Sequence, residues 1–157
     1  MDGRSDDTAD DPADARRASS MSALALADAK ELAELWARAG LEPRYETLRG
    51  PEVGLTMTRG RAGAAGAAFN LGEATVTRCV VRLDSGVGGA AYVLGRAPEK
   101  ARIAALCDAL LQTEAAETVR AHILEPLERS RAIKIREAER AAAGTQVEFF
   151  TMTRGEP

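Results

Sequence analysis

Hydrophobic positions near the start of the chain recur at the spacing of a helix. Between residues 28 and 40 the apolar side chains fall on one stripe, as in an amphipathic helix. Asp28 is suited to cap that helix at its N-terminus, and Gly40 is suited to end it. An earlier helix is predicted to begin after Pro12 and to run through Leu24.

The spacing then changes to the two-residue period of strands. The predicted strands cover residues 45–49, 53–59, 74–83 and 89–96. Gly50 and Pro51 mark a turn between the first two strands. Short links join the strands, which predicts an antiparallel meander.

The last third returns to helical spacing and then ends in a strand pattern. Pro98 suits the first position of one helix, and a second helix extends to Gly144. Pro126 lies inside this second helix and must kink or divide it. Residues 147–153 have strong β character. The predicted fold class is therefore α+β, with N-terminal helices, an antiparallel β-meander, two longer helices and a C-terminal strand.

Charge is distributed unevenly along the 157 residues. Of 24 acidic and 21 basic residues, the first 20 positions hold six and three, which leaves 18 of each sign in the rest. We expect residues 1–12 to form a disordered acidic tail and residues 13–157 to form a single domain. A neutral body lacks the basic field of a nucleic-acid-binding protein, so that function is disfavoured.

The cysteines and the single histidine do not form a recognisable site. Cys79 and Cys107 have no CxxC spacing, which disfavours zinc and fits a reducing compartment. His122 lies beside the apolar stripe of its helix, which favours a partly buried structural role. The N-terminus has no apolar signal region and no run reaches the ~20 apolar residues of a membrane helix. We therefore expect a cytoplasmic protein that does not enter a membrane.

A glycine-rich stretch, GRAGAAG at residues 60–66, has the composition of a phosphate-binding loop. Such a loop needs a helix directly after it, whereas a strand pattern follows here. A flexible link is therefore the favoured interpretation. A stand-alone domain that binds anions or nucleotide phosphates remains the alternative.

Two arginines on one strand need an explanation. Arg78 and Arg82 point to the same side and lie roughly 13 Å apart at 3.3 Å per residue. Burial without carboxylates would be costly, so three outcomes remain. The face is exposed, it meets acids of the same chain, or it meets another subunit or an anionic ligand. From the residues alone, exposure or internal pairing ranks first.

The C-terminal segment is apolar and close to the chain end. Phe149, Phe150 and Met152 make it adhesive, and a terminal strand is ordered only when a sheet holds it. The segment could close the sheet of its own chain or add to a neighbour's sheet. The physical arguments thus indicate a subunit that associates with partners.

Five motifs carry a resemblance to a known family. They are GEATVTRCVVRL (72–83), YVLGR (92–96), LCDALLQ (106–112), PLE (126–128) and EFFTMTRG (148–155). In this order and spacing the chain closely resembles the PhnG family, the small subunits of the bacterial carbon–phosphorus lyase core complex. The resemblance spans about residues 13–156. Cys79 departs from the small residue expected there and leaves the arginines in place.

The resemblance implies a role within a complex. PhnG-like proteins assemble with PhnH-, PhnI- and PhnJ-like core subunits and act with an accessory ATP-binding-cassette-like subunit. The complex attaches an alkylphosphonate to the ribose C1′ of ATP and releases adenine, in phosphonate catabolism. ATP with Mg is a substrate of the complex, and this chain alone is expected to bind no cofactor. Catalytic residues are expected on the partner subunits and none on this chain.

Within such a complex, certain residues are candidates for contacts with partners or anions. An interface role is favoured over direct substrate contact, because buried arginines are common interface anchors. The candidates are Glu73, Arg78, Arg82, Arg96, Phe149, Phe150, Met152 and Arg154.

Overall fold

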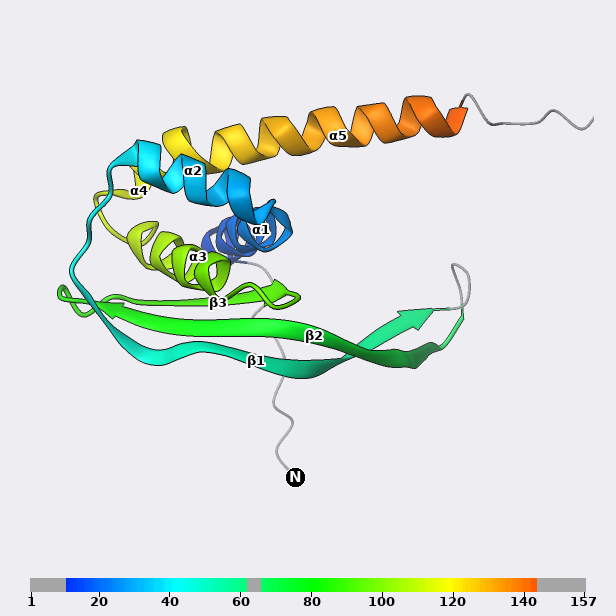
Figure 1. The fold of residues 1–157 in the computed structure, drawn as a ribbon, viewed down its shortest axis with the longest axis horizontal. Helices are drawn as coiled ribbons and strands as arrows, with labels where there is room; N and C mark the ends of the chain where they lie inside the picture. Colours follow the sequence, from blue (N-terminus) through cyan, green and yellow to red (C-terminus); the bar gives the residue numbers. More distant parts are fainter. Residues whose placement is uncertain (1–10, 62–65, 144–157) are drawn as a thin grey trace, which may run out of the picture.

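The computed structural model describes residues 11–61 and 66–143, and these form an α+β fold, as predicted (Figure 1). The first half contains helices α1 (Pro12–Leu26) and α2 (Ala29–Ala39), then strands β1 (Tyr45–Arg61), β2 (Ala68–Leu83) and β3 (Gly88–Leu94). The second half contains α3 (Pro98–Leu110), α4 (Ala116–Val119), a π-helical turn (Arg120–Leu124) and α5 (Glu125–Ala143). The predicted C-terminal strand and residues 1–10 of the predicted tail lie outside the described residues.

Helix α2 begins and ends at the residues that the sequence indicates, whereas α1 begins one residue earlier than predicted. The Asp28 carboxylate accepts hydrogen bonds from the backbone N–H groups of Lys30 and Glu31, at 3.0 and 3.1 Å. Gly40 ends α2 in the left-handed conformation with φ of 61°. Asp11 caps α1, whose first residue is Pro12, so this helix includes part of the predicted tail.

The sheet is antiparallel with strand order β1-β2-β3, as the meander prediction requires. The prediction of two strands around a turn at Gly50 and Pro51 is wrong, because residues 45–61 form one strand. Register shifts on either side of Arg49 show that the Gly–Pro pair lies in an irregular part of the ladder. A proline there costs no ladder hydrogen bond, so the strand bulges without ending. β2 also begins earlier than predicted, at Ala68.

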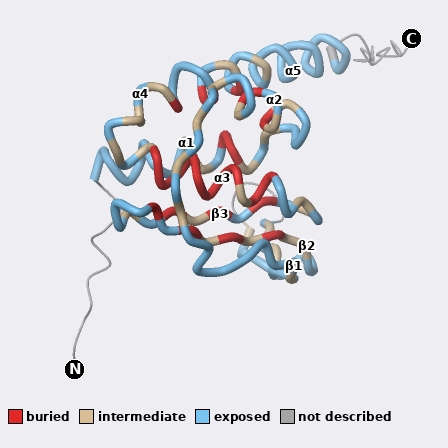
Figure 2. The backbone as a smooth tube through the Cα atoms, turned by 60° about the vertical axis from the view of Figure 1, so that its left-hand side comes forward, coloured by how far each residue is buried: buried red, intermediate tan, exposed pale blue. Residues whose placement is uncertain are grey.

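The core lies between the sheet and α3. Ten of the thirteen residues of α3 are buried, and alanines supply much of its surface (Figure 2). The small side chains let α3 approach the sheet closely, to the point that a Cβ on Gly89 would lie 2.2 Å from the Ala105 carbonyl oxygen. Helices α1 and α2 pack on α3 from above, so helices cover only one face of the sheet.

Pro126 interrupts the last long helix, as predicted, but the interruption takes the form of a π-helical turn just before it. The Glu125 N–H bonds to the Arg120 carbonyl, five residues back. Pro126 has no N–H to continue the α-helical pattern, and the wider turn absorbs this loss. The chain then continues as α5, which extends well past the other helices (Figure 1).

Candidate functional site

The uncovered face of the sheet carries the two arginines singled out above. Along β2, Thr77, Cys79 and Val81 are buried against the helices, so the residues between them point to the opposite side. Arg78 and Arg82 therefore lie on the uncovered face, which we call the open face. Cys79 points away from them, as strand parity predicts.

Both arginines pair with glutamates of the neighbouring strand. The Arg78 Nε lies 3.0 Å from the Glu52 Oε2, and Arg82 pairs with Glu46 in the same way. In each case the partners are directly opposite in the β1–β2 register. The Arg78 side chain remains 38% exposed, so solvent screens the pair. Exposure and internal pairing thus both hold, and such pairs contribute about 0–1 kcal/mol each.

Apolar side chains are also exposed on the sheet. Within the described residues, eight of the eleven exposed large hydrophobic side chains lie on the three strands: Leu48, Val53, Leu55, Met57, Phe69, Leu71, Tyr92 and Leu94. Leu55 is 65% exposed and Leu94 is 68% exposed. Exposed apolar side chains that gather on one part of a surface are a common feature of protein contact sites.

Much of this apolar surface belongs to a two-stranded extension of the sheet. Residues 53–61 of β1 and 68–76 of β2 pair with each other and run beyond α1, α2 and α3, and we call this part the arm (Figure 1). Leu55 and Met57 lie on one side of the arm, because they oppose Thr75 and Glu73 in the register. The arm has no covering helix, so its apolar side chains have no core to enter.

The remaining candidates are dispersed. Glu73 is exposed on the arm, on the side opposite to the open face. Arg96 is exposed just after β3, where the Gly95 N–H bonds to the Thr75 carbonyl at 2.8 Å. The structure therefore places Arg78 and Arg82 on one face of β2, Glu73 on the other side of the arm, and Arg96 near the base of the arm. Phe149, Phe150, Met152 and Arg154 lie outside the described residues.

A partly buried ion pair was missed by the sequence reasoning. Arg17 on α1 donates from Nε and Nη2 to the two oxygens of Asp108 on α3, at 2.9 and 2.8 Å. Asp108 is 1% exposed and also accepts the Ala90 N–H of β3 at 3.0 Å. These bonds raise the pKa of Arg17. The acid in the middle of the apolar run LCDALL was the signal, because an isolated buried carboxylate needs a partner.

Other buried polar groups in the described residues have structural roles. The Thr77 hydroxyl donates to the Gly95 carbonyl and accepts the Ala97 N–H, which fixes the corner between β3 and α3. Lys100 donates to the Ala25 carbonyl near the end of α1, and burial lowers its pKa. Burial also raises the pKa of the Cys107 thiol to about 12, so this thiol stays protonated and unreactive.

His122 does not fit its prediction. It was expected to be partly buried, but its side chain is exposed, since the π-helical turn directs Ile123 and Leu124 inward instead. Within the described residues, no group of three or more histidine, cysteine or acidic side chains is arranged to hold a metal ion. Nor is any described helix long and apolar enough to cross a membrane.

A groove of about 620 Å³ lies between α1, the end of α3 and the start of α5. Its lining contains both arginines and acids, so it has no clear preference for anions. Its charged lining residues are Arg16, Arg17 and Arg120 with Asp14, Asp108, Glu125 and Glu128.

Comparison with known proteins assigns a likeness over almost the whole chain. A family model described as "Phosphonate metabolism protein PhnG" matches residues 15–155. The chain is also 45% identical over 150 residues to the alpha-D-ribose 1-methylphosphonate 5-triphosphate synthase subunit PhnG of Rhizobium meliloti (strain 1021). That alignment covers 95% of this chain and 96% of the relative.

Proposed function

The chain belongs to the PhnG family, and from this premise we propose that it is a non-autonomous subunit of an alpha-D-ribose 1-methylphosphonate 5-triphosphate synthase complex. The observation that carries the proposal is the 45% identity over nearly the full length of both proteins.

In the proposed reaction, the complex transfers an alkylphosphonate to the ribose C1′ of ATP and releases adenine. ATP with Mg enters as a substrate of the whole complex. The partners are PhnH-, PhnI- and PhnJ-like subunits with an accessory ATP-binding-cassette-like subunit, in the cytoplasm. The reacting groups lie on these partners, and this chain supplies binding surface.

The exposed surfaces support an assembly role. The arm and the open face carry apolar side chains that a monomer would leave in water, such as Leu55 and Leu94. Arg78 lies beside Tyr92 on the open face, and both Arg78 and Arg82 have glutamate partners already in place. The ion pairs already hold these side chains in place, so binding a partner would cost little further side-chain entropy. The glutamates can then accept, and the arginines donate, additional hydrogen bonds.

A pull-down tests the proposal. The full chain is tagged in its own host, the cells grow on methylphosphonate as sole phosphorus source, and the eluted proteins are identified. Three core partners in fixed ratio are expected, whereas the same cells grown on phosphate serve as the control for expression. A chain that elutes alone under both conditions would refute the subunit role.

The alternative, a stand-alone anion-binding domain, predicts a different result. The isolated chain would bind ATP or methylphosphonate by calorimetric titration, using GRAGAAG and the arginines. Strand β2 follows that stretch at Ala68, so the helix that a phosphate loop requires is not there. A flat trace at millimolar ligand is the expected outcome.

A further inference from the structure

The outer edge of β3 is a regular strand edge. The Leu83 N–H bonds to the Val87 carbonyl at 2.9 Å, so in the antiparallel ladder the odd-numbered residues of β3 bond to β2. The even-numbered residues, Ala90 and Tyr92 among them, therefore point their N–H and C=O groups away from β2.

Part of this edge is occupied by side chains and part is vacant. The Asp108 carboxylate accepts the Ala90 N–H, and Gln112 Nε2 donates to the Gly88 carbonyl at 2.9 Å. The outward N–H and C=O of Tyr92 have no hydrogen-bond partner among the described residues. An edge of this kind pairs readily with another strand.

The other edge of the sheet is less suited to pairing. The outer edge of β1 contains Pro51, which has no N–H, and two register irregularities around Arg49. Bulges and prolines of this kind hinder the addition of a strand. Of the two edges, β3 is thus the receptive one.

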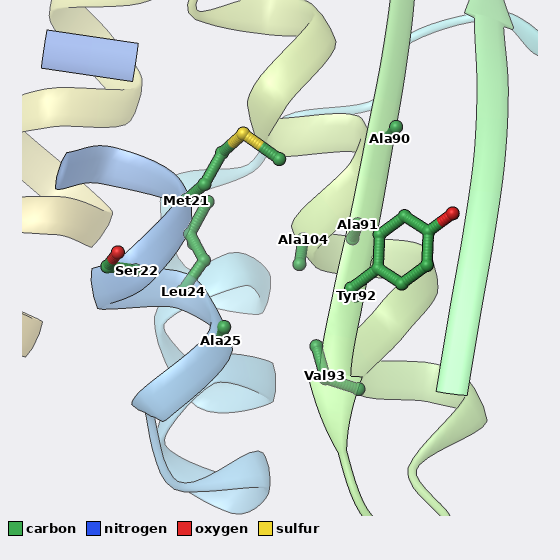
Figure 3. A pocket seen from close by; sticks show the side chains of 9 residues that line it. All are labelled: Met21, Ser22, Leu24, Ala25, Ala90, Ala91, Tyr92, Val93 and Ala104. Carbon is green, nitrogen blue, oxygen red and sulfur yellow. The ribbon is translucent and has the colours of Figure 1, made fainter. Parts of the chain in front are cut away.

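An apolar cavity lies directly beside the receptive edge. It has a volume of about 220 Å³ and separates α1 from β3 (Figure 3). Met21 and Leu24 approach it from α1, while Val93 and Ala104 close it on the other side. An apolar cavity of about 150 Å³ can hold a benzene ring, so this one has room for a phenylalanine side chain.

The chain contains one segment that matches both features, in residues 147–153. Its alternate residues Val147, Phe149 and Thr151 are uncharged, whereas Glu148 lies in the other set. If this segment added to β3 as a strand, one set of alternate residues would face the helices and the apolar cavity. The uncharged set, Val147, Phe149 and Thr151, suits that side. Phe149 is the ring of suitable size in that set.

Helix α5 determines which molecule this segment can meet. Its last salt bridge to the helices is the contact of Lys134 with Glu31, at 3.3 Å. Nine more residues carry it about 14 Å farther at 1.5 Å per residue, past the other helices (Figure 1). Helix α5 therefore ends beyond α1, α2 and α3 and not beside β3 of its own chain (Figure 1).

We propose that residues 147–153 of a second copy of this chain add to β3 as a strand and insert Phe149 into the cavity between α1 and β3. Tyr92 supplies the backbone hydrogen bonds, and Met21 and Leu24 supply the apolar contact. Exchange between two copies would pair them, in addition to the partner contacts of the proposed function.

Photo-crosslinking of the full chain tests the proposal directly. Tyr92 is replaced by p-benzoylphenylalanine, and ¹⁴N- and ¹⁵N-labelled copies are co-assembled and irradiated with whichever partners co-purify. Crosslinked peptides should join position 92 to residues 147–153 with one light and one heavy half. Crosslinks confined to one label would mean pairing within a chain, and crosslinks to another protein would mean a different strand. Either result overturns the proposal without touching the subunit role.

Two further substitutions in the crosslinking chain check the cavity. Phe149→Asp and Ser22→Trp, which fills the cavity from an exposed position of α1, should each reduce the mixed-label crosslink at least fivefold. Ser19 lies on the same helix but lines the 620 Å³ groove and not the cavity beside β3. Ser19→Trp should therefore leave the yield of the mixed-label crosslink unchanged. An undiminished crosslink in both test variants would refute the insertion of Phe149.

Discussion

At the residue scale, the closest approach in the fold falls on one of two adjacent glycines. A Cβ on Gly89 would lie 2.2 Å from the Ala105 carbonyl oxygen and 2.6 Å from the Ala109 nitrogen. These are backbone atoms of α3 and cannot move aside alone. A Cβ on Gly88 would meet nothing closer than the Val81 oxygen at 3.9 Å. Alanine at either position removes the same flexibility of a glycine backbone, but only at Gly89 does it also create a clash with α3. Comparing the two substitutions therefore measures the packing effect alone.

Gly89→Ala is expected to lower the free energy of unfolding by about 2–3 kcal/mol, because α3 must move off the sheet. Gly88→Ala is the matched control and should stay within about 0.5 kcal/mol of the parent. Urea unfolding followed by the fluorescence of Trp36 measures both. Equal effects of the two changes would contradict the close packing of α3.

The ion pair of Arg17 and Asp108 gives a second test at this scale. Arg17→Ala leaves the buried Asp108 carboxylate with only the Ala90 N–H, so stability should fall by about 2–3 kcal/mol. Arg16→Ala removes the adjacent, exposed arginine and should change stability by less than about 0.5 kcal/mol. The same unfolding measurement distinguishes them, and matching losses would argue against a specific pair.

At the element scale, capping and periodicity could be read from the sequence, while irregular backbone could not. Asp28 and Gly40 bound α2 as predicted, because local hydrogen bonds decide helix ends. The bulge at Pro51 and the length of β2 depend on pairing with a distant strand, so local signals misplace them. For the same reason three outcomes remained open for the face that carries Arg78, until the strand register paired this arginine with Glu52.

The cap of α2 makes stability depend on pH. Hydrogen bonds from the Glu31 and Lys30 N–H groups hold the pKa of Asp28 below its usual value. A lowered pKa in the folded state adds stability above the unfolded value of about 3.9, and this is lost as pH falls through the folded pKa. Thermal melts from pH 6 to 3 should show a smaller acid-side loss for Asp28→Asn than for the parent. Parallel curves would exclude Asp28 as a source of acid sensitivity.

At the scale of the whole molecule, the fold keeps a small alanine-rich core and places large apolar side chains on the arm and the open face. The family resemblance, rather than local pattern, indicated a subunit of a complex, and the PhnG family match supports it. Sequence reasoning listed Arg78 and Arg82 but missed Leu55 and Met57, because strand alternation does not reveal which part of a sheet lacks a covering helix.

Leu55→Ser combined with Met57→Ser should reduce co-purification of the core partners at least tenfold, since the apolar contact with them would be lost. The isolated variant should unfold at the same urea concentration as the parent, because these side chains are outside the core. Thr56→Ser, between them on the other side of β1, is the control. Full recovery of the complex by the double variant would remove the arm from the interface.

The outer part of α5 has a consequence for motion. Beyond Lys134 the described side chains up to Ala141 are exposed, so this part of the helix relies mainly on its own backbone hydrogen bonds. Amide protons in this part should exchange with deuterium far sooner than those of α3, with protection fading toward the C-terminal end. Assembly that engages this helix would slow the exchange. The difference in exchange rate between the free chain and the complex should therefore be largest at the C-terminal end of α5, where the free helix opens most easily.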